Sequence, residues 1–474
     1  MSRLQNKNTF DTKSFLRIVI SLALPIALQN LLVTTASMVD TIMIGTRGEL
    51  AVAAVGICSQ ISSLFFSCYF GFICGALLYF SQYWGAEDHD GINRTFGLSL
   101  LTLMVVALGF SGVAIFAPEK LLSIYTDKEN IIDLATPYIR IVGFSYPILV
   151  LNQIISFLMR STERVKAPLI ASVISIVVNF CLNWLLINGN WGCPEMGPAG
   201  AAVGTLVSTV VSFVFLLIFL LKDKSTVVLQ VRKMFCFTDG FVGKYFKKCL
   251  PVIANEFLYG VGQMLINMVI GRQAESAIAA MAAYRVLEGF VFAFFGGLAD
   301  ASSVVVGREV GAGRPMNGYR YMKGFAILCP AITFAIMAVF LCINQPLLGL
   351  FGLGPEALRY GKYMILIFMF AGAIRTCNYI MNIGFRAGGE AVFGTVVEIG
   401  ALFLISVPMT WIAGMVWQLP FLAVFAFVYT DELLRFVIEI FYARSCRWVK
   451  PVTPQGVAAM PGFRQELSAM RKKK

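Results

Sequence analysis

Long apolar segments constrain this chain more than any other feature of its sequence. Twelve of them are long enough to cross a hydrocarbon layer of about 30 Å as a helix, which takes roughly 20 residues. The predicted spans lie near residues 16–44, 52–84, 96–117, 132–159, 167–188, 198–221, 249–270, 277–307, 321–343, 358–385, 392–416 and 420–443. The sequence therefore predicts an all-α integral membrane protein with twelve transmembrane helices.

Composition agrees with a lipid environment and excludes several classes of function. Of the 474 residues, 58% are hydrophobic and 14% are charged, against about a quarter charged in a soluble domain. The eleven cysteines are scattered singly, so we expect neither a zinc site nor a disulfide framework. The one histidine, His89, lies in a polar loop, and no nucleophile motif or phosphate loop is found. We expect no enzyme activity and no cofactor.

Lysine and arginine predict the orientation of the chain in the bilayer. With the N-terminus inside, 28 of the 38 basic residues fall in inside segments and 6 in outside segments. This bias places both termini in the cytoplasm and agrees with an even number of spans. The net charge of +12 thus indicates a membrane surface rather than a nucleic-acid partner. The first apolar segment is too long for a cleavable signal peptide.

An internal repeat divides the chain into two halves. A shift of 226 residues places Leu24-Pro25 on Leu250-Pro251, Gly85-Ala86 on Gly311-Ala312 and Arg160 on Arg386. Each half then carries six spans, and because six is even, both halves have the same topology, as in a parallel repeat. The predicted parts are an N-terminal six-helix lobe (1–221), a cytoplasmic linker (222–248), a C-terminal six-helix lobe (249–443) and a basic cytoplasmic tail (444–474).

Two related bundles are typical of transporters that expose a central cleft alternately to each side of the membrane. We expect such a two-lobed unit to work as a monomer in the lipid bilayer. Ionisable residues inside spans are costly and mark functional sites by default. They therefore supply the candidate site residues in both lobes.

In the N-terminal lobe, four polar residues are predicted to form a cation-coupling site. Asp40 lies near the outer end of the first span, at the depth of Asn179 and Asn183 on the fifth, and the hydroxyl of Thr205 can lie nearby. Hard oxygen ligands of this kind suit a proton or a sodium ion. The alternative is that Asp40 lies at the interface and is hydrated by water.

In the C-terminal lobe, Glu256, Asp300 and Glu398 are predicted to lie roughly 12 Å from the inner surface, with Arg375 slightly deeper. This polar cluster is either a protonation switch or a static ion-pair network that holds helices together. Two further sets are predicted to pair within their own helices. They are Glu432, Arg435 and Glu439, and Arg285 and Glu288.

Five stretches resemble the multidrug and toxic compound extrusion (MATE) family of transporters, and the similarity spans nearly the whole chain. They are LPIALQNLLVTTASMVDTIMIG (24–45), QYWGA (82–86), LPVIANEFLYG (250–260), RAGGE (386–390) and RSCRWVKP (444–451). The resemblance implies a bacterial plasma-membrane exporter of cationic or amphipathic organic compounds, driven by inward flow of protons or sodium.

The resemblance also implies a role for the aspartate of the first span, here Asp40, and for Glu256, which matches an acid of a bacterial subgroup. The family often has an asparagine followed four residues later by an aspartate on the fifth span. Asn179 matches this pattern, but Asn183 replaces the acid, which weakens the case for sodium and leaves protons open. The alternative function is a lipid or lipid-linked sugar flippase of the same superfamily, for which a more cationic cleft is expected.

Overall fold

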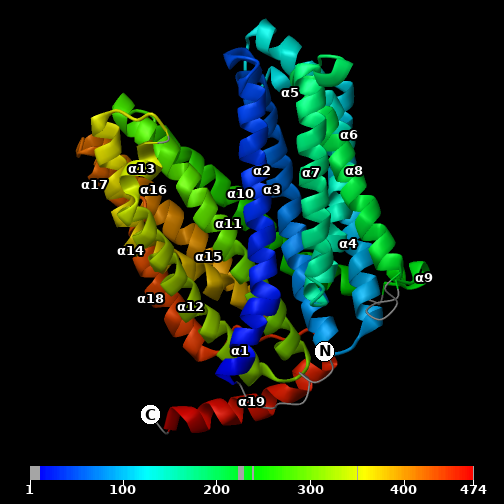
Figure 1. The fold of residues 1–474 in the computed structure, drawn as a ribbon. Helices are drawn as coiled ribbons and strands as arrows, with labels where there is room; N and C mark the ends of the chain where they lie inside the picture. The colour runs from blue at the N-terminus through cyan, green and yellow to red at the C-terminus, as the bar shows by residue number, and fades with distance from the viewer. Residues whose placement is uncertain (1–10, 223–228, 238–239, 350, 473–474) are drawn as a thin grey trace. The chain divides into compact units, whose positions relative to one another are not determined.

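The computed structural model describes residues 11–222, 229–237, 240–349 and 351–472, and every regular element in these ranges is a helix (Figure 1). The first half comprises α1 (Thr12–Ile18), the π-helical turn η2 (Val19–Ala23), α2 (Leu24–Gly45), α3 (Glu49–Gly85), α4 (His89–Phe116), α5 (Pro118–Leu122), α6 (Glu129–Ser161), α7 (Lys166–Asn188), the 3-10 turn η3 (Asn190–Gly192), α8 (Pro198–Lys222) and α9 (Val231–Met234). The second half comprises α10 (Phe241–Ile270), α11 (Glu275–Gly311), α12 (Pro315–Cys342), α13 (Asn344–Gly349), α14 (Pro355–Ala387), α15 (Val392–Ala401), η4 (Leu402–Ser406), α16 (Val407–Trp411), η5 (Ile412–Val416), α17 (Phe421–Phe427), α18 (Thr430–Ser445) and α19 (Pro454–Lys472).

Within the described ranges, eleven helical segments are long and apolar enough to cross a membrane. Two of these segments are composite, because α1, η2 and α2 run on as one helix, and so do α15 to η5. Helices suit these sequences because a lipid environment offers no partner for a backbone N–H or C=O, so each must be satisfied within its own segment. The predicted all-helical membrane fold is confirmed.

The last predicted span, 420–443, is present as two shorter helices, α17 and α18. The helix is interrupted at Val428 and Tyr429, and five charged residues on α18 lower its hydropathy. The carbonyl of Val428, freed by the break, accepts a hydrogen bond of 2.7 Å from the hydroxyl of Ser406. A break in a membrane helix is tolerated when a neighbouring group satisfies the backbone in this way.

The predicted repeat is visible in the lengths of the helices. Three helices of the first half recur 226 residues later with both ends unchanged: α3 as α11, α4 as α12, and α6 as α14. The loops between these helices must therefore also have equal lengths in the two halves. The two halves therefore share the positions of helix ends as well as individual residues.

The described residues pack as two compact units. The C-terminal unit comprises those within Met1–Ala27, Ser81–Asp88 and Lys247–Lys474, and the N-terminal unit comprises those within Leu28–Phe80 and His89–Phe246. The predicted lobes divide the chain at one point, whereas the described residues of two segments of the first half, Met1–Ala27 and Ser81–Asp88, pack within the C-terminal unit. Phe15, for example, is buried in the C-terminal unit, edge-on to Phe325 at 5.2 Å between ring centroids.

The segment Ser81–Asp88 belongs to the C-terminal unit because the end of α3 meets the backbone of α11 directly. A Cβ atom on Gly85 would lie 2.0 Å from the carbonyl oxygen of Arg308, and one on Gly311 would lie 2.0 Å from that of Gln82. The offset of 226 exchanges these two contacts, so the same close approach is made twice. Only glycine allows the helices to pack at this distance.

Residues 452–455 pack where the ends of α3 and α11 meet. The backbone N–H of Val452 donates to Gln82 Oε1 at 2.8 Å, and Thr453 Oγ1 donates to the carbonyl of Gly311 at 2.7 Å. Gln455 Nε2 donates to the carbonyl of Ala86 at 3.2 Å. The start of α19 is therefore held by hydrogen bonds to the ends of α3 and α11.

Two glycines on α11 allow a matched test of this packing. A Cβ on Gly297 would lie 2.3 Å from the backbone of Ala27, whereas one on Gly289 would meet nothing within 4 Å. We predict that Gly297→Ala lowers the free energy of unfolding by about 1–3 kcal/mol through overpacking. Gly289→Ala should leave it unchanged or raise it by up to about 1 kcal/mol, because alanine is the better helix former. Thermal unfolding in detergent measures both, and equal melting temperatures for the two variants would contradict the close contact.

Candidate functional site

Three of the four residues predicted for the N-terminal lobe are hydrogen-bonded to one another. Asn183 Nδ2 donates to Asp40 Oδ1 at 2.9 Å and to Asn179 Oδ1 at 3.2 Å. Asn179 and Asn183 are one turn apart on α7 and so share a face, while Asp40 comes from α2. Asn183 is fully buried, and Asp40 is half-buried. We call these three residues the Asp40 group.

Helix α8 contributes Gly204 to this group, a residue that the sequence analysis missed. A Cβ at this position would lie 2.2 Å from Asn183 Oδ1, so only glycine leaves room for the amide. The neighbouring Thr205 donates its hydroxyl to the carbonyl of Ala201 at 3.0 Å, a contact within α8. The glycine-rich start of α8, PAGAAVG, was the available signal for a close helix contact.

Among the described residues, the Asp40 group contains one buried oxygen atom without a hydrogen-bond partner, besides the oxygens that share the Asn183 amide. Asn183 Oδ1 is buried and has no hydrogen-bond partner among the described residues. One carboxylate and two amide oxygens can hold a proton or a small cation, since both favour hard oxygen ligands. Its role in coupling remains a prediction.

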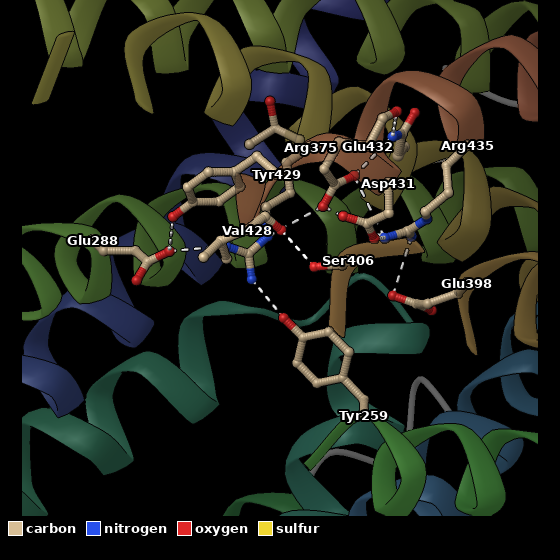
Figure 2. Close-up of polar contacts among 12 residues, drawn as sticks. Tyr259, Glu288, Arg375, Glu398, Ser406, Val428, Tyr429, Asp431, Glu432 and Arg435 are labelled. Carbon is tan, nitrogen blue, oxygen red and sulfur yellow. Dashed lines mark hydrogen bonds and ion pairs between the residues drawn. The ribbon is translucent and has the colours of Figure 1, made fainter. Parts of the chain in front are cut away.

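A cavity of about 230 Å³ lies inside the C-terminal unit, next to a smaller one of about 90 Å³. Figure 2 shows the polar contacts among residues that line the larger cavity, such as Tyr259 and Arg375. Arg375 and Glu398 line both cavities, and Glu256 lines the smaller one. The structure thus brings together three of the four residues predicted for this lobe. Asp300 lies on α11 and is not among the residues that line either cavity.

Arg375, on α14, is held at the larger cavity by three different groups. Its guanidinium forms an ion pair with Glu288 at 2.8 Å, donates to the Tyr259 hydroxyl at 2.6 Å and lies 4.3 Å from the centre of the Phe292 ring. The predicted pairing of Glu288 with Arg285 is therefore wrong. Arg375 reaches Glu288 from another helix, and Arg285 donates to Asn267 instead.

Arg435, on α18, is shared among four carboxylates. It lies 3.1 Å from Glu398, 3.4 Å from Glu432, 3.7 Å from Glu439 and 3.9 Å from Asp431. The predicted pairing along α18 is thus present, but the shortest of these contacts goes to Glu398 on α15. Arg435 is 4% exposed, so these carboxylates are its neighbours in place of water.

Arg386 joins the remaining predicted acid to this set. Its guanidinium lies 3.4 Å from Glu256 and 3.8 Å from Glu398. The amides of Asn255 and Asn382 also donate to Glu398, at 3.0 and 2.9 Å. Amide donors of this kind stabilise a buried carboxylate.

These contacts form one connected set, which we call the ionic network. It comprises Glu256, Glu288, Glu398, Asp431, Glu432, Glu439, Arg375, Arg386 and Arg435. Arg375 closes the set, because it also lies 3.6 Å from Glu432. The sequence analysis placed Glu256, Glu398 and Arg375 in a polar cluster. It treated the other residues as pairs within single helices or, for Asp431 and Arg386, did not propose them as site residues. Their signal was present, since each is an ionisable residue in a predicted membrane helix or at its end.

Comparison with known proteins agrees with this architecture. The sequence model of the MatE family matches residues 25–185 and again residues 251–412, more than half of the chain. Because the two matches begin 226 residues apart, they also confirm the repeat. Because the members of this family are transporters, the match over most of the chain identifies it as a transporter and not an enzyme.

Individual relatives match over nearly their whole length. "Uncharacterized transporter YisQ" of Bacillus subtilis is 22% identical, with 91% of this chain and 94% of that protein covered. "Probable multidrug resistance protein NorM" of Thermotoga maritima is also 22% identical, with 91% and 93% covered. A solved structure of a multidrug resistance MATE family transporter in an outward-facing conformation has the same fold, with a TM-score of 0.81, 18% identity and 90% and 95% coverage. From the double match of the family model and this shared fold, we conclude that the chain belongs to the MatE family of membrane transporters.

Proposed function

We propose that this protein is a secondary active multidrug exporter, which moves cationic or amphipathic organic compounds out of a bacterial cell in exchange for protons. Transport would occur by alternating access, in which the two six-helix lobes move against each other, as a repeat of this kind supports. Relatives named as multidrug resistance proteins support the class of substrate. The acidic excess of the ionic network supports a positively charged coupling ion, and the lack of any hydrogen-bond donor to Glu439 among the described residues favours the proton.

The observation that carries this proposal is an imbalance of charge. Six carboxyl groups of the ionic network face three guanidinium groups. A buried charge without a counter-charge is strongly destabilising, and lipid cannot supply one. Arg285 also lines the larger cavity, but one more arginine would still leave an excess of carboxyl groups. The network therefore needs bound protons or a cation to approach neutrality.

Glu439 is the carboxyl group to which we assign one of these protons. Its side chain is wholly buried, and neither carboxyl oxygen has a hydrogen-bond partner in the described part of the chain. Its nearest charged atom is Arg435 Nε at 3.7 Å, and that guanidinium already serves three other carboxylates. An ionised carboxylate with no hydrogen-bond donor is a costly buried state, whereas a protonated one is not.

The Asp40 group is the second place for a coupling ion. Because Asn183 stands where the family often has an acid, the group contains one carboxyl group rather than two. A proton needs only this one carboxylate, whereas a sodium ion is held by several oxygen ligands and benefits from a second negative charge, so the missing acid favours proton coupling over sodium. Import of protons through either lobe would then supply the energy for export.

Gradient-driven transport tests the proposal directly. With the purified protein in liposomes and a fluorescent cationic dye, we predict that a pH gradient drives dye movement and a sodium gradient does not. Asp40→Asn or Glu256→Gln should reduce the initial rate at least tenfold, since each removes a titratable group (~1.4 kcal/mol or more in barrier height). Asp133→Asn serves as the control, because Asp133 is an exposed carboxylate outside both sites.

Three outcomes would revise the proposal. Movement driven by sodium alone would replace the proton with sodium as the coupling ion. Full activity of both variants would remove the two groups from the coupling mechanism. If neither gradient moved any dye, a labelled-lipid assay for flippase activity would be the next experiment.

The charge balance of the network can be tested through stability. Arg435→Gln leaves four carboxylates without their shared cation, so we predict a loss of about 3–5 kcal/mol in the free energy of unfolding. Adding Glu439→Gln should restore part of this loss, and so should lower pH, because each removes an unpaired negative charge. Arg285→Gln is the control and should change stability by about 1 kcal/mol at most, since Arg285 is exposed. Equal thermal unfolding of Arg435→Gln and the wild type would contradict a shared, buried guanidinium.

A further inference from the structure

A second polar cavity lies outside the ionic network, where α12 begins and α19 crosses it. Its volume is about 240 Å³. Its walls are the start of α12 with the preceding loop, which supplies Arg314, Asn317 and Arg320, and one face of α19. We call it the α12–α19 cavity. Helix α19 begins at Pro454 and so lies beyond residue 412, where the family match ends.

Two arginines line this cavity in different ways. Arg314 is fixed by the carboxylate of Glu309, with Nε 2.7 Å from Oε2. Arg320 is half-buried, and no carboxylate of the described residues forms an ion pair with it. The cavity therefore contains a guanidinium whose charge is open to a ligand.

Asn317 supplies a neutral hydrogen-bonding group at the cavity. Its side chain lines the cavity and is 8% exposed, and no hydrogen bond to the amide is formed by the described residues. The amide faces the cavity with unused hydrogen-bonding capacity, which water or a ligand in the cavity can satisfy. Pro315 occupies the first turn of the 28-residue helix α12, so the positive end of the helix dipole also points toward the cavity.

Helix α19 has the properties of an interfacial helix. It runs across the ends of α11 and α12, as the red helix in Figure 1 shows. Phe463 is buried against the unit, whereas Val457 is 56% exposed and Arg464 is exposed. An exposed apolar residue and an exposed arginine on an amphipathic helix favour a membrane surface with anionic lipids.

We propose that the α12–α19 cavity binds a phosphate group, presented by the headgroup of an anionic phospholipid. In the orientation that the basic residues predict, this corner of the protein faces the inner leaflet. Arg320 and Arg314 supply the positive charge, the Asn317 amide supplies a neutral donor, and Glu466 is the one acidic residue of the lining and is exposed. A soluble phosphate ester has the same chemistry and could occupy the same site.

Calorimetric titration of the full-length protein in detergent tests the site without any transport assay. The probes are short-chain phosphatidylglycerol, short-chain phosphatidylcholine and inorganic phosphate. We expect phosphatidylglycerol to bind at least tenfold more tightly than phosphatidylcholine and to weaken as salt rises, since a charged contact is screened. Arg320→Gln should weaken phosphatidylglycerol binding by about tenfold, which corresponds to the loss of one charge-assisted hydrogen bond.

Three further variants make the result specific. Asn317→Ala should weaken binding, Arg320→Lys should retain part of it, and Arg464→Gln, an exposed change on α19 outside the cavity, should leave it unchanged. Inorganic phosphate that binds as tightly as phosphatidylglycerol would support the phosphate site and assign it to a soluble ligand. Equal affinity of the wild type and Arg320→Gln for phosphatidylglycerol would overturn the proposal, as would equal affinity for the two lipids.

Discussion

The sharing of Arg435 among four carboxylates is the interaction on which the C-terminal unit depends most. In a soluble protein, water could separate these groups, but in a membrane protein each must find its partner within the chain. Glu398 comes from α15, while the other three carboxylates share α18 with the arginine. The requirement for a shared counter-charge therefore fixes how these two helices lie against each other. It also makes the unit responsive to protons, since each proton gained or lost changes the partners that the guanidinium can satisfy.

Much of the fold could be predicted from the sequence because hydropathy and the repeat are properties of single residues and spacings. Eleven of the spans and the offset of 226 follow from such patterns, whereas the interruption of the last span does not. The ionic network could be predicted only in part. Pairing of Glu432 with Arg435 is local, whereas the contact of Arg375 with Glu288 joins residues 87 positions apart, which spacing alone does not reveal. The same limit applies to Gly204, whose importance depends on the position of Asn183, and to Phe15, which packs in the unit of the other half.

The two halves place polar residues at matching positions and differ in their charge and contacts. In the N-terminal unit, Arg160 donates to Gln29 Oε1 at 2.8 Å, and Gln29 Nε2 donates to Ser172 at 2.7 Å. The offset of 226 carries these three positions to Arg386, Asn255 and Glu398, and in the C-terminal unit Arg386 and Asn255 both contact Glu398. A neutral hydroxyl in one half thus corresponds to a carboxylate in the other. The repeat supplies the positions twice, and the side chains give each copy its own contacts and chemistry.

The equal lengths of α3 and α11, of α4 and α12, and of α6 and α14 have an evolutionary consequence. Since the two halves diverged, substitutions have changed most of their side chains, yet no insertion or deletion has survived between residues 49 and 161 or in the matching stretch 275–387. Soluble proteins usually absorb such events in their loops. Here even the loops have kept their length, so we expect engineered insertions in them to be tolerated far less well than substitutions at the same positions.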